Sequence, residues 1–125
     1  MAFIFLDWRG TLNTTLNPEY VIQRLQKRKH YVCLYSSYLP YGNDIEGTKA
    51  KLASEAANIV LTKTGLAQEA LEEVIEVFKE DPRQTEVWIV DDDYQNYLQE
   101  KLEVKGFKVK QFTLQSVKNT FPWNQ

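Results

Sequence analysis

The chain has 125 residues, of which 43% are hydrophobic and 26% charged, so it can form one globular domain with a buried core. Its formal net charge of −2 gives no electrostatic reason to expect binding to nucleic acid or to an anionic membrane. A single cysteine excludes an internal disulfide, and a single histidine excludes a multi-histidine metal site. With no recognisable signal peptide or membrane-spanning run, we expect a cytoplasmic location.

The first half of the chain predicts three strands and two helices. Residues 2–6 form an apolar run that is typical of a strand buried on both faces. Asn17 and Pro18 predict the start of a helix, with Asn17 as its N-cap. Two more strands are expected over residues 31–35 and 58–62, with a helix between them over about 47–57.

The second half continues the same alternation. Apolar residues at helical spacing predict a helix over about 66–80, which Asp81 and Pro82 should end. Further elements are expected as a strand at 86–90, a helix over about 94–104 that ends at Gly106, and an edge strand at 107–112. Strands that alternate with helices predict a mostly parallel sheet covered on both faces, in one α/β domain over residues 1–125.

Chemically useful side chains follow every strand of the expected core. In parallel sheets, ligands bind beyond the carboxyl ends of the strands, so these side chains should meet at one edge. They are Asp7 after the first strand, Ser36 and Ser37 after the second, Lys63 after the third, and Asp91, Asp92 and Asp93 after the fourth. The amino ends of the same strands show no such bias. This convergence is the main functional signal in the residues themselves.

The expected cluster suits a divalent cation and a phosphoryl group. Asp7 beside Asp91 and Asp92 would place several carboxylates together, and they cannot all stay ionised unless a cation joins them. Mg²⁺ is the natural candidate, because it prefers oxygen ligands and is held by few carboxylates. Phosphate oxygens could then be bound by Ser36, Ser37, Lys63 and the backbone of a turn at Gly10 and Thr11.

Each of these residues also has an ordinary structural explanation. Aspartates such as Asp92 and Asp93 are favoured at helix N-caps and first turns. Serine is common in turns, and a lone lysine is usually solvated. The tyrosines near the expected strand ends could line a planar ligand or simply pack, and they are Tyr35, Tyr38, Tyr41 and Tyr94.

Four short motifs resemble those of the haloacid dehalogenase (HAD) superfamily. The family's D-x-D-G-T after its first strand is here Asp7-Trp8-Arg9-Gly10-Thr11. Its Ser or Thr after the second strand is similar to Ser36, and its lysine before a helix is similar to Lys63. Its acidic pair followed by Asp or Asn is similar to Asp91-Asp92 with Asn96.

The resemblance implies a Rossmann-like three-layer fold with strand order 5-4-1-2-3. It also implies Asp7 as the nucleophile, Mg²⁺ held by Asp7, the backbone carbonyl of residue 9 and Asp92, and phosphate held by Ser36 and Lys63. The segments in which such proteins insert cap domains are short here, so we expect a capless form with an open site. Such a site suits a phosphorylated small molecule or macromolecule, and an oligomer is compatible with it.

Arg9 departs from the family pattern. The family's phosphatases have there a second acid that protonates the leaving group and activates water, which an arginine cannot do because it stays protonated. Three hypotheses follow. Asp7 attacks substrates whose leaving group needs no proton; Arg9 is a ligand clamp or built-in cation paired with Asp91 to Asp93; or Arg9 points away from the site.

These hypotheses lead to two expected functions. The first is a phosphohydrolase that uses Asp7 and Mg²⁺, in which Arg9 makes catalysis weak or specialised. The alternative is a non-catalytic module that binds a phosphorylated ligand or a protein partner on the same scaffold. A dehalogenase is a third possibility, for which the missing acid is the sole support.

Overall fold

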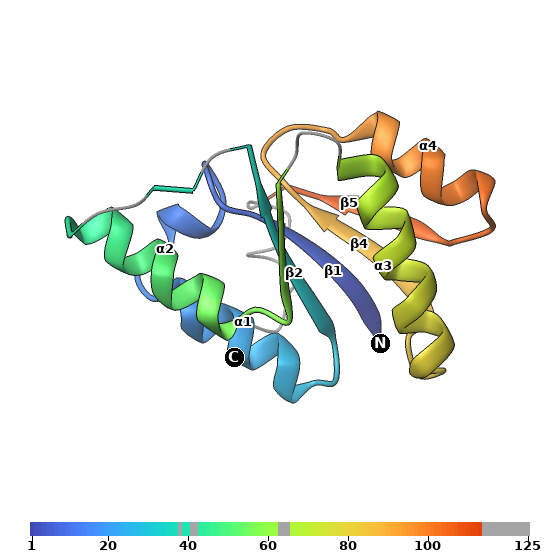
Figure 1. The fold of residues 1–125 in the computed structure, drawn as a ribbon, viewed down its shortest axis with the longest axis horizontal. Helices are drawn as coiled ribbons and strands as arrows, with labels where there is room; N and C mark the ends of the chain where they lie inside the picture. The colour runs from blue at the N-terminus through green and yellow to red at the C-terminus, as the bar shows by residue number, and fades with distance from the viewer. Residues whose placement is uncertain (38, 41–42, 63–65, 114–125) are drawn as a thin grey trace.

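The chain folds as a three-layer α/β/α sandwich of the Rossmann-like type, with helices on both faces of a parallel sheet (Figure 1). The structure is a computed structural model, and it describes residues 1–37, 39–40, 43–62 and 66–113. Among the helices of these residues, none is both long enough and apolar enough to cross a bilayer. The predicted fold class and strand order are confirmed.

The sheet has five strands in the order β3-β2-β1-β4-β5, and every neighbouring pair is parallel. They are β1 (Ala2–Asp7), β2 (Tyr31–Ser36), β3 (Ile59–Thr62), β4 (Glu86–Val90) and β5 (Val109–Phe112). β1 is central, and all six of its residues are buried. A central position for β1 places its carboxyl end between those of β2 and β4.

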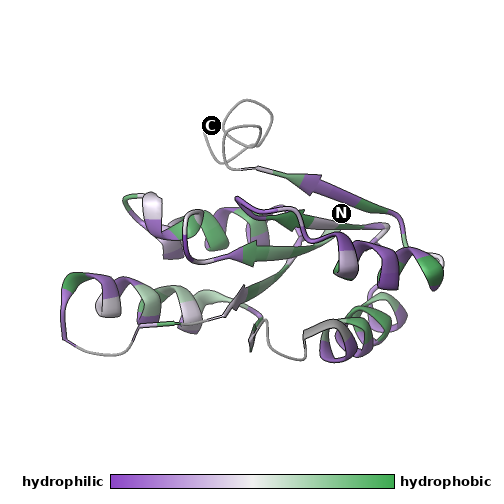
Figure 2. Cartoon of the chain, turned by 90° about the horizontal axis from the view of Figure 1, so that it is seen from above, coloured by the Kyte–Doolittle hydropathy of each residue, from purple (hydrophilic) through white to green (hydrophobic). Residues whose placement is uncertain are grey.

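The helices are divided between the two faces of the sheet. Figure 1 shows α1 (Pro18–Lys27) and α2 (Ile45–Ala56) on one side, and α3 (Leu66–Glu80) and α4 (Asn96–Val104) on the other. A short 3-10 helix, η1 (Leu12–Thr14), follows the turn after β1. In Figure 2 the helices alternate between hydrophobic and hydrophilic residues, as expected for helices that cover a sheet with one face.

The alternation of side chains along β1 divides the core into two parts. Ile4 and Leu6 point toward α1 and α2, where they pack with Ile22 and Leu25. Phe3 and Phe5 point to the opposite face and pack with residues of α3 and α4 such as Val74 and Leu102. Because both faces of β1 are covered, its sequence has no polar positions until Asp7.

Several element boundaries differ from the predicted ones. β1 includes one residue beyond the apolar run 2–6, and Asp7 ends the strand as predicted. α2 begins at Ile45, because Asp44 caps it by accepting a hydrogen bond from the Gly47 N–H at 2.7 Å. Asn17 does occupy the N-cap position of α1, although its side chain makes no capping hydrogen bond.

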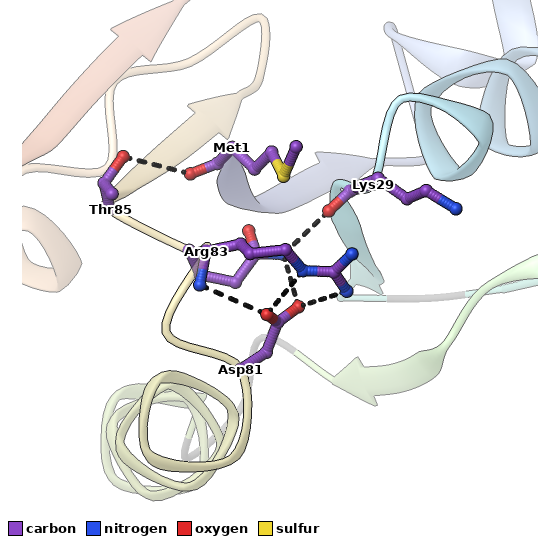
Figure 3. A network of polar contacts seen from close by, with 6 residues as sticks. Met1, Lys29, Asp81, Arg83 and Thr85 are labelled. Atoms are coloured by element: carbon purple, nitrogen blue, oxygen red, sulfur yellow. Dashed lines mark hydrogen bonds and ion pairs between the residues drawn. The ribbon is translucent and has the colours of Figure 1, made fainter.

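At the amino edge of the sheet, a polar network joins the segment between α3 and β4 to the start of β1 (Figure 3). Asp81 pairs with Arg83 at 2.8 Å, and the Thr85 hydroxyl donates to the Met1 carbonyl at 3.3 Å. The Gln84 amide donates to the Lys29 carbonyl at 2.7 Å. Lys29 has φ +71°, which an L-residue adopts at some cost, so this bond stabilises a strained turn. The network is structural and lies opposite the carboxyl ends of the strands.

Candidate functional site

Three aspartates meet at the carboxyl edge of the sheet. Asp7, Asp91 and Asp92 each offer a carboxylate oxygen, and these oxygens lie within 4.8 Å of one another. Asp7 and Asp91 are 1% and 3% exposed, whereas Asp92 is exposed to solvent. The structure therefore brings together the three residues that the sequence analysis proposed as metal ligands.

Strand register explains why these residues converge. β1 and β4 are paired up to Leu6 and Val90, so Asp7 and Asp91 are the next residues on two adjacent strands. The Asp91 N–H donates to the Phe112 carbonyl at 3.0 Å, which fixes the chain as it leaves β4. Two carboxylates at adjacent strand ends repel each other, and this repulsion needs a compensating charge or proton.

The carboxylate of Asp91 is held in place by several donors. Its Oδ2 accepts a hydrogen bond from the Tyr35 hydroxyl at 2.6 Å and another from Gln95 Nε2 at 3.0 Å. Its Oδ1 accepts from the Asp93 N–H at 3.0 Å. These contacts orient Asp91 before any ligand arrives, in the way that outer-shell partners orient metal ligands.

The electrostatics of the cluster affect two groups in particular. Burial, and then the negative charge of Asp91, raise the pKa of Tyr35 far above its usual range, so Tyr35 stays a donor at any physiological pH. A hydrogen bond with Asp91 and partial desolvation raise the pKa of Asp92, while a hydrogen bond with Asp7 acts in the opposite direction. Without a cation, Asp92 therefore binds a proton more readily than an isolated aspartate.

The turn after β1 brings the backbone close to Asp92. Gly10 has φ +80°, a conformation that favours glycine, and its N–H donates to Asn13 Oδ1 at 2.8 Å. A Cβ atom at Gly10 would lie 2.3 Å from Asp92 Oδ2. Glycine is thus required here both by the backbone and by the position of the Asp92 carboxylate.

The proposed phosphate-binding residues are placed as follows. Thr11 is buried, and its hydroxyl donates to Asp7 Oδ2 over a long 3.5 Å. Ser36 is the last residue of β2 and is 3% exposed, one strand away from Asp7, and Ser37 follows it at the surface. Lys63, proposed to neutralise the phosphate charge, lies outside the described residues.

Arg9 does not join the aspartates. It is exposed, and within the described residues its guanidinium forms no ion pair with Asp7, Asp91, Asp92 or Asp93. It instead lines a cavity of about 180 Å³ with Trp8, Pro40 and Glu46. The built-in-cation hypothesis thus finds no supporting contact, and the hypothesis that Arg9 points away from the acids agrees with the structure.

Trp8 lies at the same cavity and is almost fully buried, with 1% exposure. Its indole Nε1 is also buried, and in the part of the chain that the structure describes it has no hydrogen-bond partner. A buried donor without a partner costs about 1–3 kcal/mol. In native proteins such a group is explained by strain, by a catalytic role, or by an ordered water or ion.

The donor set at the aspartate cluster fits Mg²⁺. All three residues offer hard oxygen atoms, and a hydrogen bond with Asp91 together with desolvation raises the pKa of Asp92, which a bound cation would lower. The exposure of Asp92 leaves one side of the cluster accessible to water and phosphate oxygens, which Mg²⁺ usually keeps as ligands. The residues that would hold the ion are Asp7, Asp91 and Asp92.

The structure corrects two predictions near this site. Asp93 does not cap α4, because the helix begins at Asn96 and its N-cap is Gln95. Tyr35 is no stacking surface, because its ring is buried in the core and its hydroxyl binds Asp91. Of the other tyrosines, Tyr94 is 74% exposed, and Tyr38 and Tyr41 lie outside the described residues.

Sequence analysis also missed two groups, Gln95 and the Tyr35 hydroxyl. Gln95 lies four residues after Asp91, which is close enough in sequence to have suggested a contact. Tyr35 is paired with Asp7 in the β1–β2 register, but its hydroxyl reaches Asp91 on the far side of β1. No sequence pattern indicates this reach.

Neither a protein-family model nor a curated protein matches this sequence.

Proposed function

We propose that this chain is a Mg²⁺-dependent phosphohydrolase of the HAD-like kind, with Asp7 as its nucleophile and Arg9 in place of the usual second acid. The observation that carries the proposal is the cluster of Asp7, Asp91 and Asp92, whose oxygens lie within 4.8 Å at the end of the central strand. Ligands of open α/β sheets bind at this edge.

The chemistry assigned to Asp7 is in-line attack on a phosphoryl group. A carboxylate oxygen of Asp7 forms a bond to phosphorus as the bond from phosphorus to the leaving oxygen breaks, which gives an aspartyl phosphate. Water then attacks the phosphorus, releases phosphate and restores Asp7. Mg²⁺, when bound, would neutralise the charge that the phosphoryl oxygens bring to the aspartates.

The other residues would bind and orient the substrate. Ser36, buried at the end of the neighbouring strand, would donate to a phosphoryl oxygen. The Gly10 turn brings backbone close to the cluster, and Tyr35 and Gln95 hold Asp91. Lys63 is proposed to add positive charge.

The absence of a second acid restricts the leaving group. Arg9 stays protonated, so it neither donates a proton to the leaving oxygen nor activates water as a base. Loss of a positioned acid-base group typically costs about 10²–10⁴-fold in rate. Substrates whose leaving group is already acidic, such as acyl or aryl phosphates, do not need a proton donor for the first step, so they lose less rate.

The second candidate function is a non-catalytic module that binds a phosphorylated ligand or partner. Arg9 is again the observation that favours it, because a cluster of carboxylates without the acid-base group would retain binding but lose efficient turnover. The two candidate functions differ in whether the wild-type protein hydrolyses a phosphate ester and in how Arg9→Asp, which introduces the acid, changes that activity.

The test is hydrolysis of para-nitrophenyl phosphate with Mg²⁺ by wild type, Asp7→Asn and Arg9→Asp. We expect slow wild-type turnover that Asp7→Asn abolishes, and faster turnover in Arg9→Asp, by up to about 10²-fold. No turnover in wild type with a gain in Arg9→Asp would support the binding module. No turnover in any of the three folded proteins would contradict both the nucleophile and the inherited catalytic geometry.

A further inference from the structure

The cavity lined by Trp8 and Arg9, the two residues that follow Asp7 in the chain, has a charge pattern of its own. It measures about 180 Å³ and is lined by Trp8, Arg9, Pro40 and Glu46. Arg9 contributes a guanidinium that forms no ion pair or hydrogen bond with the described residues. Trp8 contributes an indole whose buried N–H also has no partner there. Two residues that line one small cavity thus each carry a hydrogen-bond donor with no partner among the described residues, which suits a planar acceptor group.

The cavity is also close to the proposed nucleophile. Arg9 is two residues after Asp7, so their Cα atoms can be at most about 7 Å apart. A phosphoryl group at Asp7 and a second group at Arg9 can therefore belong to one small molecule. The second group would lie on the leaving-group part of the substrate.

We propose that this cavity binds a carboxylate on the leaving group, so that the substrates are small phosphate esters or acyl phosphates that carry a carboxylate. This inference rests on the proposed function for the identity of the reacting group. Guanidinium and carboxylate have matching planar geometry and form paired hydrogen bonds. The indole N–H of Trp8 would donate to the same group after a small rotation of the ring.

Glu46 argues for a singly charged group rather than a second phosphate. It is exposed in the first turn of α2 and lines the same cavity, and its Oε1 accepts from Asn13 Nδ2 at 3.4 Å. A dianion would meet this negative charge at close range, whereas a carboxylate carries half as much charge. The cavity thus selects by charge as well as by shape.

The proposal also gives Arg9 a positive role. At this position the chain has exchanged a proton donor for a fixed cation, which loses acid catalysis but gains attraction for an anionic leaving group. A carboxylate near the phosphoryl group is otherwise repelled by three aspartates, so a compensating cation is needed.

The test compares meta-carboxyphenyl phosphate with meta-carbamoylphenyl phosphate, which have nearly the same shape but differ in charge. We expect wild type to prefer the carboxylate by about tenfold in kcat/KM, and Arg9→Gln to lose that preference. Trp8→Phe, which keeps a ring but removes the N–H, should reduce the preference by a smaller factor. Arg28→Gln, at an exposed arginine beyond the end of α1, is the matched control and should keep it.

A binding measurement separates this inference from the proposed function. The dissociation constants of meta-carboxybenzylphosphonate and its carboxamide, which cannot be hydrolysed, are measured by calorimetry with Mg²⁺ for wild type and Arg9→Gln. Tighter binding of the carboxylate by wild type alone supports the cavity even if no phosphate ester is turned over. Equal binding of the two compounds by wild type overturns it, even if Asp7-dependent hydrolysis is observed.

Discussion

At the scale of single residues, the aspartate cluster depends on a tyrosine that the sequence did not point to. The Tyr35 hydroxyl crosses from β2, beneath the end of β1, to Asp91 at the end of β4. It thereby links β2 to the end of β4, two strands that are not neighbours in the sheet. A hydroxyl in this position stabilises the fold and orients a proposed metal ligand at the same time.

Tyr35→Phe should therefore weaken both stability and the response to Mg²⁺. Loss of the 2.6 Å contact to Asp91 should lower the free energy of unfolding by about 1–3 kcal/mol. The Mg²⁺ concentration for a half-maximal thermal shift should rise by about tenfold, as when outer-shell partners of metal ligands are removed. Both quantities come from thermal melts at increasing Mg²⁺.

Tyr31→Phe is the matched control for this prediction. The Tyr31 hydroxyl donates to Glu73 at 2.9 Å, at the opposite end of the same strand. Its loss should cost some stability without changing the response to Mg²⁺. Equal changes in the Mg²⁺ response of both variants would show that Tyr35 does not act through Asp91.

At the scale of elements, the turn between β1 and η1 determines where Asp92 can lie. Gly10 and Gly106 both have positive φ, +80° and +93°. A Cβ at Gly10 would lie 2.3 Å from Asp92 Oδ2, whereas a Cβ at Gly106 would meet nothing within 4 Å. Substitutions at the two glycines therefore distinguish the effect of backbone strain, which both share, from displacement of Asp92, which only Gly10 would cause.

Alanine at each position gives a paired prediction. Gly10→Ala and Gly106→Ala should each lose roughly 1–2 kcal/mol of stability, because alanine is strained in this backbone conformation. Gly10→Ala alone should also lose the Mg²⁺-dependent thermal shift, since its methyl group displaces the Asp92 carboxylate. An unchanged Mg²⁺ shift in Gly10→Ala would remove Asp92 from the proposed ligand set.

At the scale of the whole molecule, the cluster of aspartates should couple stability to metal. Mg²⁺ bound to the folded state alone raises the free energy of unfolding by roughly 2.7 kcal/mol at one hundred times its dissociation constant. We expect a thermal shift in wild type and none in Asp92→Asn. In chelator, Asp92→Asn should be at least as stable as wild type, because it removes charge repulsion within the cluster. Equal Mg²⁺ shifts in both proteins would contradict a shared metal site.

The other end of the sheet should give the molecule a separate dependence on pH. His30 Nδ1 accepts a hydrogen bond from the Ala2 N–H at 3.0 Å, and burial is the main reason that the pKa of His30 lies below its ordinary value of 6.5. Below pH 6.5 His30 binds a proton in the unfolded chain but much less readily in the folded chain. The free energy of unfolding therefore falls as the pH decreases toward the pKa of His30 in the folded chain. Above pH 6.5 His30 is neutral in both states, so this destabilisation is absent.

The measurement is urea unfolding at about pH 7.5 and about pH 5.5, with Mg²⁺ absent. His30 is the chain's one histidine, so titration in this range is simple to assign. His30→Asn keeps an acceptor near the position of Nδ1 but does not titrate, and it should lose most of the difference between the two pH values. A difference that persists in His30→Asn would assign the effect to another group.

The sequence by itself determined the order and type of the elements. The apolar run of residues 2–6 is buried on both faces, and Val87, Ile89 and Val90 are buried in β4, so the sequence carries a clear signal for both strands. Chain connectivity through helices then required parallel strands. The same logic predicted that Asp7, Asp91 and Asp92 lie together, because parallel strands end at one edge.

Only the tertiary structure decided how the side chains at that edge are used. The reach of Tyr35 to Asp91 joins residues far apart in the chain, and so does the cavity that Arg9 lines together with Glu46. Asp93 is not the helix cap because α4 begins at Asn96 and is capped by Gln95, two residues further along the chain than local preference suggested. Local propensity and periodicity report which face of an element is buried, whereas side-chain direction at a strand end depends on neighbours that only the folded chain supplies.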